Sequence, residues 1–137
     1  MTPAPKFSVP FRIYWEDTDA GGVVYYANYL KFMERCRTDW LRALGIDQLQ
    51  LRAGRQLQFA VVSVAVDFLR PAVLNDEIIV TAELVHLRGA TIGFKQTIMR
   101  GDAQLVDARV RVACLDSGTL KPRPIPKDLF VEWRNGQ

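Results

Sequence analysis

Two carboxylates stand directly before a pair of glycines near the start of the chain, in the run Asp17-Thr18-Asp19-Ala20-Gly21-Gly22. Adjacent glycines allow positive φ angles and close backbone approach, so they suit a loop whose amides point at a ligand. A carboxylate beside unpaired amides can serve as a general base or a nucleophile facing an oxyanion. The same residues also build an ordinary turn, in which Asp side chains accept hydrogen bonds from turn amides. The motif by itself leaves both interpretations open.

An amphipathic helix follows the glycines and runs to about Leu44, where Gly45 suits the terminating position. Its first turn offers N–H groups without intrahelical acceptors and a partial positive charge, next to the two acids. The residues predicted for its apolar face are Tyr29, Phe32, Met33, Cys36, Trp40, Leu41 and Leu44, and those predicted for its polar face are Lys31, Glu34, Arg35, Arg37, Asp39 and Arg42.

Five segments have the character of strands. Residues 7–15 alternate, with Phe7, Val9, Phe11, Ile13 and Trp15 on one face, and Pro10 favours an edge position. Turn residues separate four further candidates, at 59–70, 77–87, 90–100 and 104–115, while 46–57 predict a short helix or a loop. One strand, one long helix and four consecutive strands predict an α+β fold with a mainly antiparallel sheet packed on one central helix.

Length and composition narrow the class of protein. The 137 residues, 49% of them apolar and 24% charged, suit one domain spanning 1–137 with a substantial core. No apolar run approaches the ~20 residues of a membrane span, and residues 1–6 lack the apolar region of a signal peptide, so we expect a cytoplasmic protein.

Charge and cysteine usage limit the partners. The net charge of +3 is compatible with an anionic partner such as coenzyme A or an acidic carrier protein, and without a basic run it argues against nucleic acid. Cys36 and Cys114, both in apolar patterns, are expected to be reduced and buried, and His86 is the only histidine. We therefore expect no metal site.

The run Asp17–Tyr25, with Tyr29, Glu34-Arg35 and Trp40-Leu41-Arg42 behind it, resembles the acyl-CoA thioesterases of the hotdog fold. It is most similar to the Tol-Pal-associated (YbgC) branch and to the 4-hydroxybenzoyl-CoA thioesterases, and the stretches 88–91 and 121–126 continue the similarity. The resemblance implies a five-stranded antiparallel sheet around the helix, and a homodimer or homotetramer with sheets joined edge to edge and active sites at the subunit interface. It also implies that the catalytic groups are Asp19, the Tyr26 backbone N–H and Gly22.

One position departs from the Tol-Pal branch, many of whose members carry His where this chain has Tyr26; the hydroxybenzoyl branch has Tyr there. A backbone N–H survives that change, but a phenol with a pKa near 10 is a poor base at neutral pH. Asp19 is therefore expected to carry the acid-base chemistry more nearly alone.

The expected reaction is hydrolysis of a short-chain or aromatic acyl-CoA, with Asp19 as general base or nucleophile and no cofactor, since coenzyme A belongs to the substrate. The alternative is a non-hydrolytic module that binds acyl thioesters or acyl carrier protein; a hotdog dehydratase is disfavoured because His86 lies outside the motif. The residues expected to contact substrate are Tyr25, Asn28, Tyr29 and Ser63 around the acyl group, and Arg88, Lys95, Lys121 and Arg123 around the phosphates.

Overall fold

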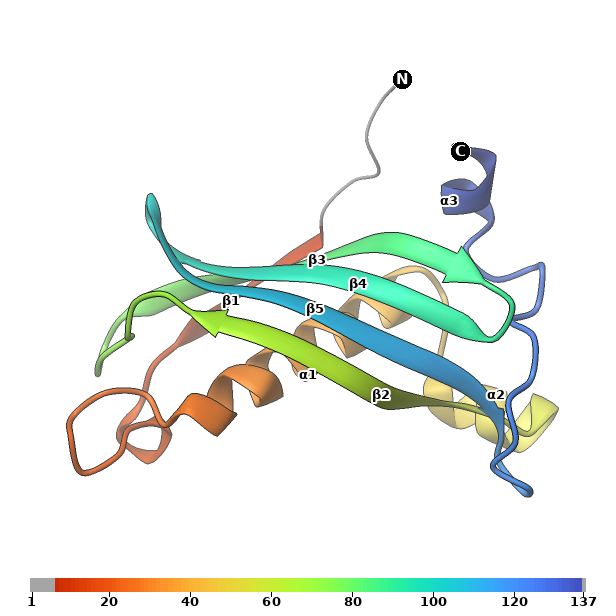
Figure 1. Cartoon of the computed structure of the whole chain (residues 1–137), viewed down its shortest axis with the longest axis horizontal. Coiled ribbons are helices and arrows are strands. Elements are labelled where there is room, and N and C mark those ends of the chain that lie inside the picture. Colours follow the sequence, from red (N-terminus) through yellow and green to blue (C-terminus); the bar gives the residue numbers. More distant parts are fainter. Residues whose placement is uncertain (1–6, 137) are drawn as a thin grey trace.

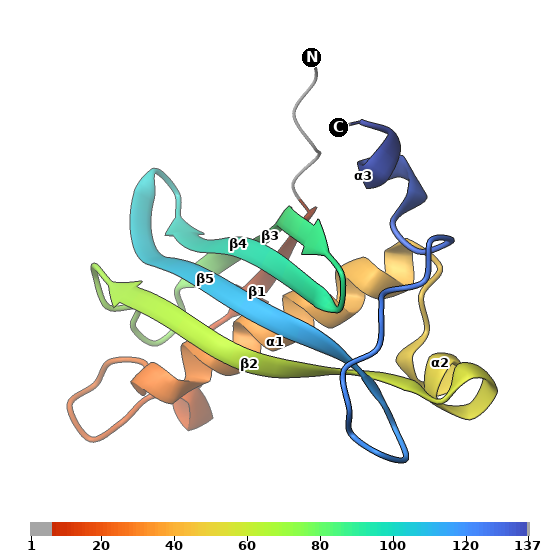
Figure 2. The ribbon, with the colours of Figure 1, turned by 45° about the vertical axis from the view of Figure 1, so that its right-hand side comes forward.

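The computed structural model describes residues 7–136, which form a five-stranded antiparallel sheet with a long helix against one face (Figure 1, Figure 2). Residues 1–6, on which the expectation of no signal peptide depends, lie outside the described residues. The strands are β1 (Phe7–Arg12), β2 (Leu57–Phe68), β3 (Glu77–Arg88), β4 (Thr91–Arg100) and β5 (Ala103–Asp116), and the helices are η1 (Trp15–Asp17, 3-10), α1 (Tyr26–Ala43), α2 (Gln48–Arg55) and α3 (Val131–Asn135).

The strands are ordered β1-β3-β4-β5-β2, and every neighbouring pair is antiparallel. The predicted arrangement of one long helix on a five-stranded antiparallel sheet is therefore confirmed. Pro10 lies on edge strand β1, as predicted, where a missing N–H is tolerated. Strand β2 forms the other edge, so the hydrogen-bonding groups along its outer side have no strand partner within residues 7–136.

Helix α1 positions the rest of the molecule because it buries a full face against the sheet. The buried residues are Tyr29, Phe32, Met33, Cys36, Trp40 and Leu41, as the helical spacing predicts. Leu44 was expected among them but is 41% exposed, because it is the C-cap and already leaves the helical path. Gly45 follows at φ +83°, the left-handed conformation that ends helices.

The first strand is shorter than predicted. It ends at Arg12, and the chain turns into η1, where the backbone N–H of Tyr14 donates to the Asp17 carboxylate at 2.9 Å. Ile13 is still buried, but Trp15 is 77% exposed, so the prediction that it faces the core is wrong. The alternation of apolar residues ran past the strand, and the buried carboxylate redirected the backbone.

The middle of β2 is unusually apolar for an exposed strand. Val61, Val62 and Val64 are 48%, 56% and 42% exposed, although a valine run normally marks a buried strand. The strand bulges between Val61 and Ser63, and it lies at the edge of the sheet. An apolar, unpaired edge of this kind invites pairing with another strand.

The two cysteines belong to the packed interior. Cys36 and Cys114 are both buried and free, and burial together with the charge of Asp39 raises the pKa of Cys36 to about 12. Within residues 7–136, no helix combines the length and the apolarity that crossing a membrane requires.

Replacing Met33 with alanine tests the packing of α1 on the sheet. Met33 is fully buried, so Met33→Ala is expected to lower the free energy of unfolding by about 2–5 kcal/mol. The exposed neighbour Arg35 provides the control, since Arg35→Ala should change stability by less than about 0.5 kcal/mol. Urea titrations followed by circular dichroism at one protein concentration measure both values; equal values would contradict the described burial.

Candidate active site

The two acids of the motif have different environments, which the sequence alone leaves open. Asp17 is buried, and its carboxylate accepts the Tyr14 N–H while lying 3.7 Å from the Lys31 ammonium. Its backbone carbonyl accepts the N–H of Tyr25 at 2.9 Å and the side-chain amide of Asn28 at 2.8 Å. Asp17 therefore joins the loop to the helix start and is a structural residue.

Asp19, by contrast, is exposed to solvent. Its Oδ1 accepts the N–H of Gly21 at 2.8 Å, and no hydrogen bond to its Oδ2 occurs among residues 7–136. The backbone carbonyl of Asp19 accepts the N–H of Gly22, and its N–H donates to Val23, which closes the loop on itself. One carboxylate oxygen is thus held by a turn amide, and the other accepts no hydrogen bond within residues 7–136.

Gly21 and Gly22 are each required for a different structural reason. Gly22 has φ +82°, a conformation in which any other L-residue is strained. A Cβ atom on Gly21 would lie 3.2 Å from Asp19 Oδ1, so a side chain there would press on the carboxylate. The predicted need for two glycines therefore follows from one φ angle and one close approach.

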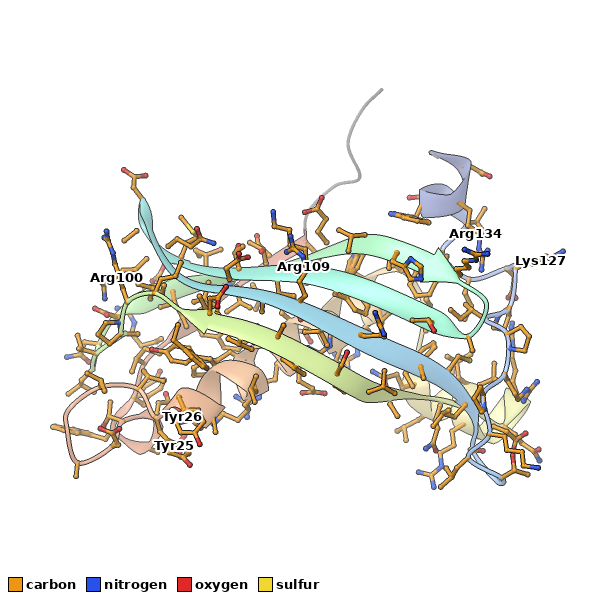
Figure 3. The ribbon with its side chains drawn as sticks, viewed as in Figure 1. Tyr25, Tyr26, Arg100, Arg109, Lys127 and Arg134 are labelled. Carbon is orange, nitrogen blue, oxygen red and sulfur yellow. The ribbon has the colours of Figure 1, made fainter. Side chains whose placement is uncertain are left out.

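The helix start is open to a ligand. Tyr25 is the N-cap, its side chain makes no capping hydrogen bond, and no acceptor within residues 7–136 takes the N–H of Tyr26. Such an N–H, carrying the partial positive charge of the helix terminus, is a donor suited to an oxyanion. Tyr25 and Tyr26 lie together at this end of the molecule (Figure 3).

Aromatic rings border the helix start, and one of them was not predicted. The rings of Tyr25 and Tyr26 lie 5.0 Å apart, and Phe68, at the end of β2, lies 6.1 Å from Tyr26 and 5.7 Å from Tyr29. Phe68 is 49% exposed, so it forms an open wall. The sequence signal for it was its place as the last apolar residue before Leu69-Arg70-Pro71, which alone does not indicate a binding role.

Tyr29 is buried, which limits its expected contact with substrate. Its hydroxyl accepts the N–H of Ala72 at 3.0 Å, and burial raises the pKa of this phenol despite that hydrogen bond. The carbonyl of Ala72 in turn accepts the N–H of Val24, two residues before the helix. Tyr29 and the segment 72–76 therefore support the loop from below.

The other residues expected to contact substrate do not gather around the acidic loop within one chain. Ser63 lies at the β2 bulge opposite Arg111, and Lys95 lies on the outer face of the sheet between Glu83 and Arg109. Arg123 donates to the carbonyl of Arg55, beside the start of β2. Arg88 and Lys121 lie at this same end, opposite the acidic loop, as the ends of β3 and β5 show (Figure 1).

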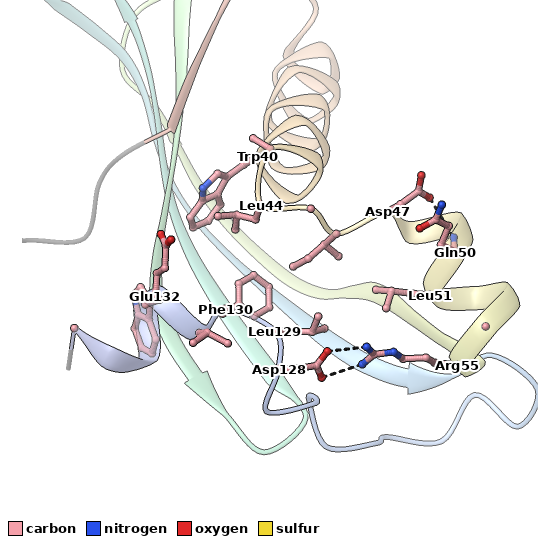
Figure 4. Close-up of a pocket in the computed structure, with 17 residues that line it drawn as sticks. Trp40, Leu44, Asp47, Gln50, Leu51, Arg55, Asp128, Leu129, Phe130 and Glu132 are labelled. Carbon is pink, nitrogen blue, oxygen red and sulfur yellow. Dashed lines mark hydrogen bonds and ion pairs between the residues drawn. The ribbon is translucent and has the colours of Figure 1, made fainter.

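A hollow with a volume of about 1010 Å³ also lies away from the acidic loop. The end of α1, helix α2 and the segment after Lys127 surround it, and the Arg55–Asp128 ion pair lies on its rim (Figure 4). A smaller cavity of about 100 Å³ lies between α1 and β2, with Arg37 among its lining residues. Within residues 7–136, no group of three His, Cys, Asp or Glu side chains is placed to hold a metal ion.

Arg37 was predicted for the solvated helix face, but it is half-buried and donates to the Gln96 side chain at 2.8 Å. Only its position between the apolar Met33 and Leu41 on the helix could have signalled this. Gln96, in turn, is fully buried in the middle of β4, where alternation predicts an apolar side chain.

A long helix packed on a five-stranded antiparallel sheet, with an acid-bearing glycine loop at the helix start, is the arrangement of the hotdog fold. The model of the thioesterase-like superfamily matches residues 13–133, and the chain belongs to this family. It is 48% identical to the acyl-CoA thioesterase YbgC of Haemophilus influenzae over 129 residues, which cover 94% of this chain and 95% of the relative.

Two further relatives extend the comparison. A 1,4-dihydroxy-2-naphthoyl-CoA hydrolase of Thermosynechococcus vestitus is 29% identical, over 94% of this chain and 89% of its own. The crystal structure of a probable thioesterase from Bartonella henselae superposes with a TM-score of 0.84 at 34% identity, over 89% of this chain and 100% of that one. The resemblance to the hotdog thioesterases is thereby confirmed, and the chain is a hydrolase of the thioesterase class.

Asp76, in the segment that supports the acidic loop, gives a prediction about how the stability of the fold depends on pH. Burial acts to raise the pKa of Asp76, but hydrogen bonds from the Val73 N–H and from Arg100 outweigh it and lower the pKa. A carboxylate with a lowered folded pKa stabilises the fold above its unfolded pKa of about 4 and loses that contribution as the pH falls through the folded value. Asp76→Asn should therefore cost about 1–3 kcal/mol at pH 7 and progressively less below about pH 4.

Urea titrations between pH 7 and pH 2.5 measure this difference. Glu77→Gln is the control, because Glu77 forms only an exposed ion pair with Arg12 and should cost at most about 1 kcal/mol. A cost for Asp76→Asn that stays constant over the whole pH range would contradict the described network.

Proposed function

We propose that this protein hydrolyses acyl-CoA thioesters to the free acid and coenzyme A. The observation that carries the proposal is an exposed carboxylate, Asp19, held by Gly21 in a loop that closes directly before a helix start with an open N–H at Tyr26. The names of the H. influenzae and T. vestitus relatives, a thioesterase and a hydrolase of CoA esters, agree with this reaction.

The thioester carbonyl oxygen binds the Tyr26 N–H, and the field of the helix start stabilises the negative charge that develops on it. In the general-base form, Asp19 takes a proton from water as the oxygen of that water bonds to the carbonyl carbon. The tetrahedral intermediate then breaks its C–S bond, and the leaving thiolate takes the proton back from Asp19. In the nucleophilic form, Asp19 Oδ2 bonds to the carbonyl carbon, thiolate leaves, and water hydrolyses the resulting anhydride.

The acyl group is expected to be short or aromatic. Tyr25, Tyr26 and Phe68 present exposed rings beside the helix start, which suits an aromatic ring or a few methylene groups. The side-chain amide of Asn28 is already bonded to the Asp17 carbonyl, so Asn28 serves the shape of this pocket.

A second copy of the chain completes the site in this proposal. An antiparallel ladder between two β2 edges, centred on Ser63 in the exposed stretch 61–65, places Phe68 of one copy opposite Gln58 of the other. Arg123 lies beside the start of β2, and Lys121 precedes Arg123 by two residues. Cations remote from the acidic loop within one chain would thus approach the loop of the partner copy, where the phosphates of coenzyme A can bind them.

The role of Asp19 is tested by steady-state thiol release from a panel of short aliphatic and aromatic acyl-CoAs. Asp19→Asn should lower kcat by about 10²- to 10⁴-fold, because an amide can neither take a proton nor attack. Glu16→Gln, an exposed acid in the same region, is the matched control and should retain activity. Binding without turnover by the wild-type protein would instead favour the non-hydrolytic module.

The role of the β2 edge is tested by Val62→Glu, which places like charges close together across the proposed symmetry axis. The wild type is expected to have two or four times the 15.6 kDa mass of one chain in light scattering. Val62→Glu should lower that mass and, with it, kcat/KM. Val85→Glu, at an exposed position of the internal strand β3, should change neither. A wild-type protein with the mass of one chain and full activity would overturn the shared site.

A further inference from the structure

Both apolar and polar side chains line the small cavity between α1 and β2. Phe59, Val61 and Phe94 are among the apolar ones, and the polar ones on α1 are Glu34, Arg37 and Thr38. Its volume of about 100 Å³ corresponds to roughly three water-sized groups. The end of a short acyl group, but not a whole acyl-CoA, fits a space of this size.

Arg37 is held in place at this cavity. Its Nη1 donates to Gln96 Oε1 at 2.8 Å, and the amide nitrogen of Gln96 donates to the carbonyls of Met33 and Thr81, both at 3.1 Å. Because Gln96 is fully buried and all three groups belong to α1 or the sheet, the guanidinium cannot swing freely.

The hydrogen bond to Gln96 is the one that the guanidinium makes within residues 7–136. Burial lowers the pKa of Arg37, and the charge of the Glu34 carboxylate, which accepts a hydrogen bond from Thr38, acts against that lowering. A guanidinium has five N–H donors, and one hydrogen bond leaves most of them for other acceptors. A partly buried guanidinium with unused donors can bind an acceptor atom of a ligand.

The cavity lies far from the helix start of its own chain, and the proposed β2 pairing would bring it near the helix start of a partner copy. Tyr26 and Arg37 are separated by about 16 Å along α1. In the proposed β2 ladder, residue 59 of the partner copy pairs with residue 67, and residue 61 of the partner pairs with residue 65. Residues 67 and 65 lie roughly 3 and 10 Å along the strand from Phe68, whose ring borders Tyr26. A four- or five-atom acyl group attached at the carbonyl extends about 5–6 Å and so reaches the nearer part of this range.

We infer that Arg37 of the partner copy determines acyl specificity, by hydrogen bonding to an oxygen carried at the far end of the acyl group. This inference rests on the proposed function and on the shared site. The apolar walls accept the carbon chain or ring, and Arg37 at the side of the cavity favours acyl groups that end in a carboxylate or a hydroxyl over apolar groups of equal length.

The test compares two matched pairs of substrates: pentanoyl-CoA with glutaryl-CoA, and benzoyl-CoA with 4-hydroxybenzoyl-CoA. Arg37→Gln should lower kcat/KM for the oxygen-bearing member of a pair about 10- to 100-fold more than for its apolar match. Arg37→Lys keeps the charge without the planar fork and should recover part of the loss. Arg35→Gln, an exposed arginine on the same helix, should leave both ratios unchanged.

A loss confined to the glutaryl pair assigns a carboxylate, and one confined to the hydroxybenzoyl pair assigns a hydroxyl. An equal loss for both members of each pair, or no loss, overturns the inference, because a merely structural Arg37 would affect all substrates alike. If the wild type hydrolyses none of the four, the proposed function fails. In that case, calorimetry measures how thioether analogues of the four substrates bind to the wild type and to Arg37→Gln. The ratio of affinities within each matched pair then decides the role of Arg37.

Discussion

The structure depends on the buried Asp17, which joins three segments at the start of α1. Its carboxylate takes the N–H that begins η1, and its carbonyl takes one N–H from the N-cap Tyr25 and another from Asn28 inside the helix. These bonds hold the N-cap and the first turn of α1 in place, and the N–H of Tyr26 has no acceptor within residues 7–136. The first acid of the motif therefore supports the helix start that the second acid, Asp19, faces in the proposed reaction.

The loop needs support because an exposed carboxylate and two glycines contribute little packing of their own. That support comes from the segment 72–76, whose backbone bonds to Val24 above and to the Tyr29 hydroxyl below. Arg100 and Asp76 fix the segment through an ion pair at 2.8 Å. Tyr29 was expected to contact substrate, but its hydroxyl accepts the hydrogen bond from Ala72 and so helps to hold the segment 72–76 in place.

Much of the fold was predictable because hydrophobic periodicity records which face each element buries. The helix, its end at Gly45 and the strands of the central sheet follow from that pattern. Alternation failed at Trp15, where the Asp17 carboxylate turns the chain, and at Gln96, where a polar side chain occupies an apolar position. The first exception comes from a local hydrogen bond between Tyr14 and Asp17, and the second from hydrogen bonds of Gln96 to residues distant in sequence, and hydrophobic periodicity records neither. The pairing of Arg37 with Gln96, 59 residues apart, is of the same kind.

Strand β2 is the element on which the proposed sharing of the site between two copies depends. Its valines are exposed, its outer edge has no strand partner among residues 7–136, and Phe68 at its end touches the tyrosines of the helix start. In one chain these features are a liability, because an apolar open edge promotes association. Under the proposed pairing the same edge brings the Arg37 cavity of one copy to the Asp19 loop of the other. Catalysis and specificity would then reside in different copies, and the apolar edge would be required by the chemistry as well as by stability.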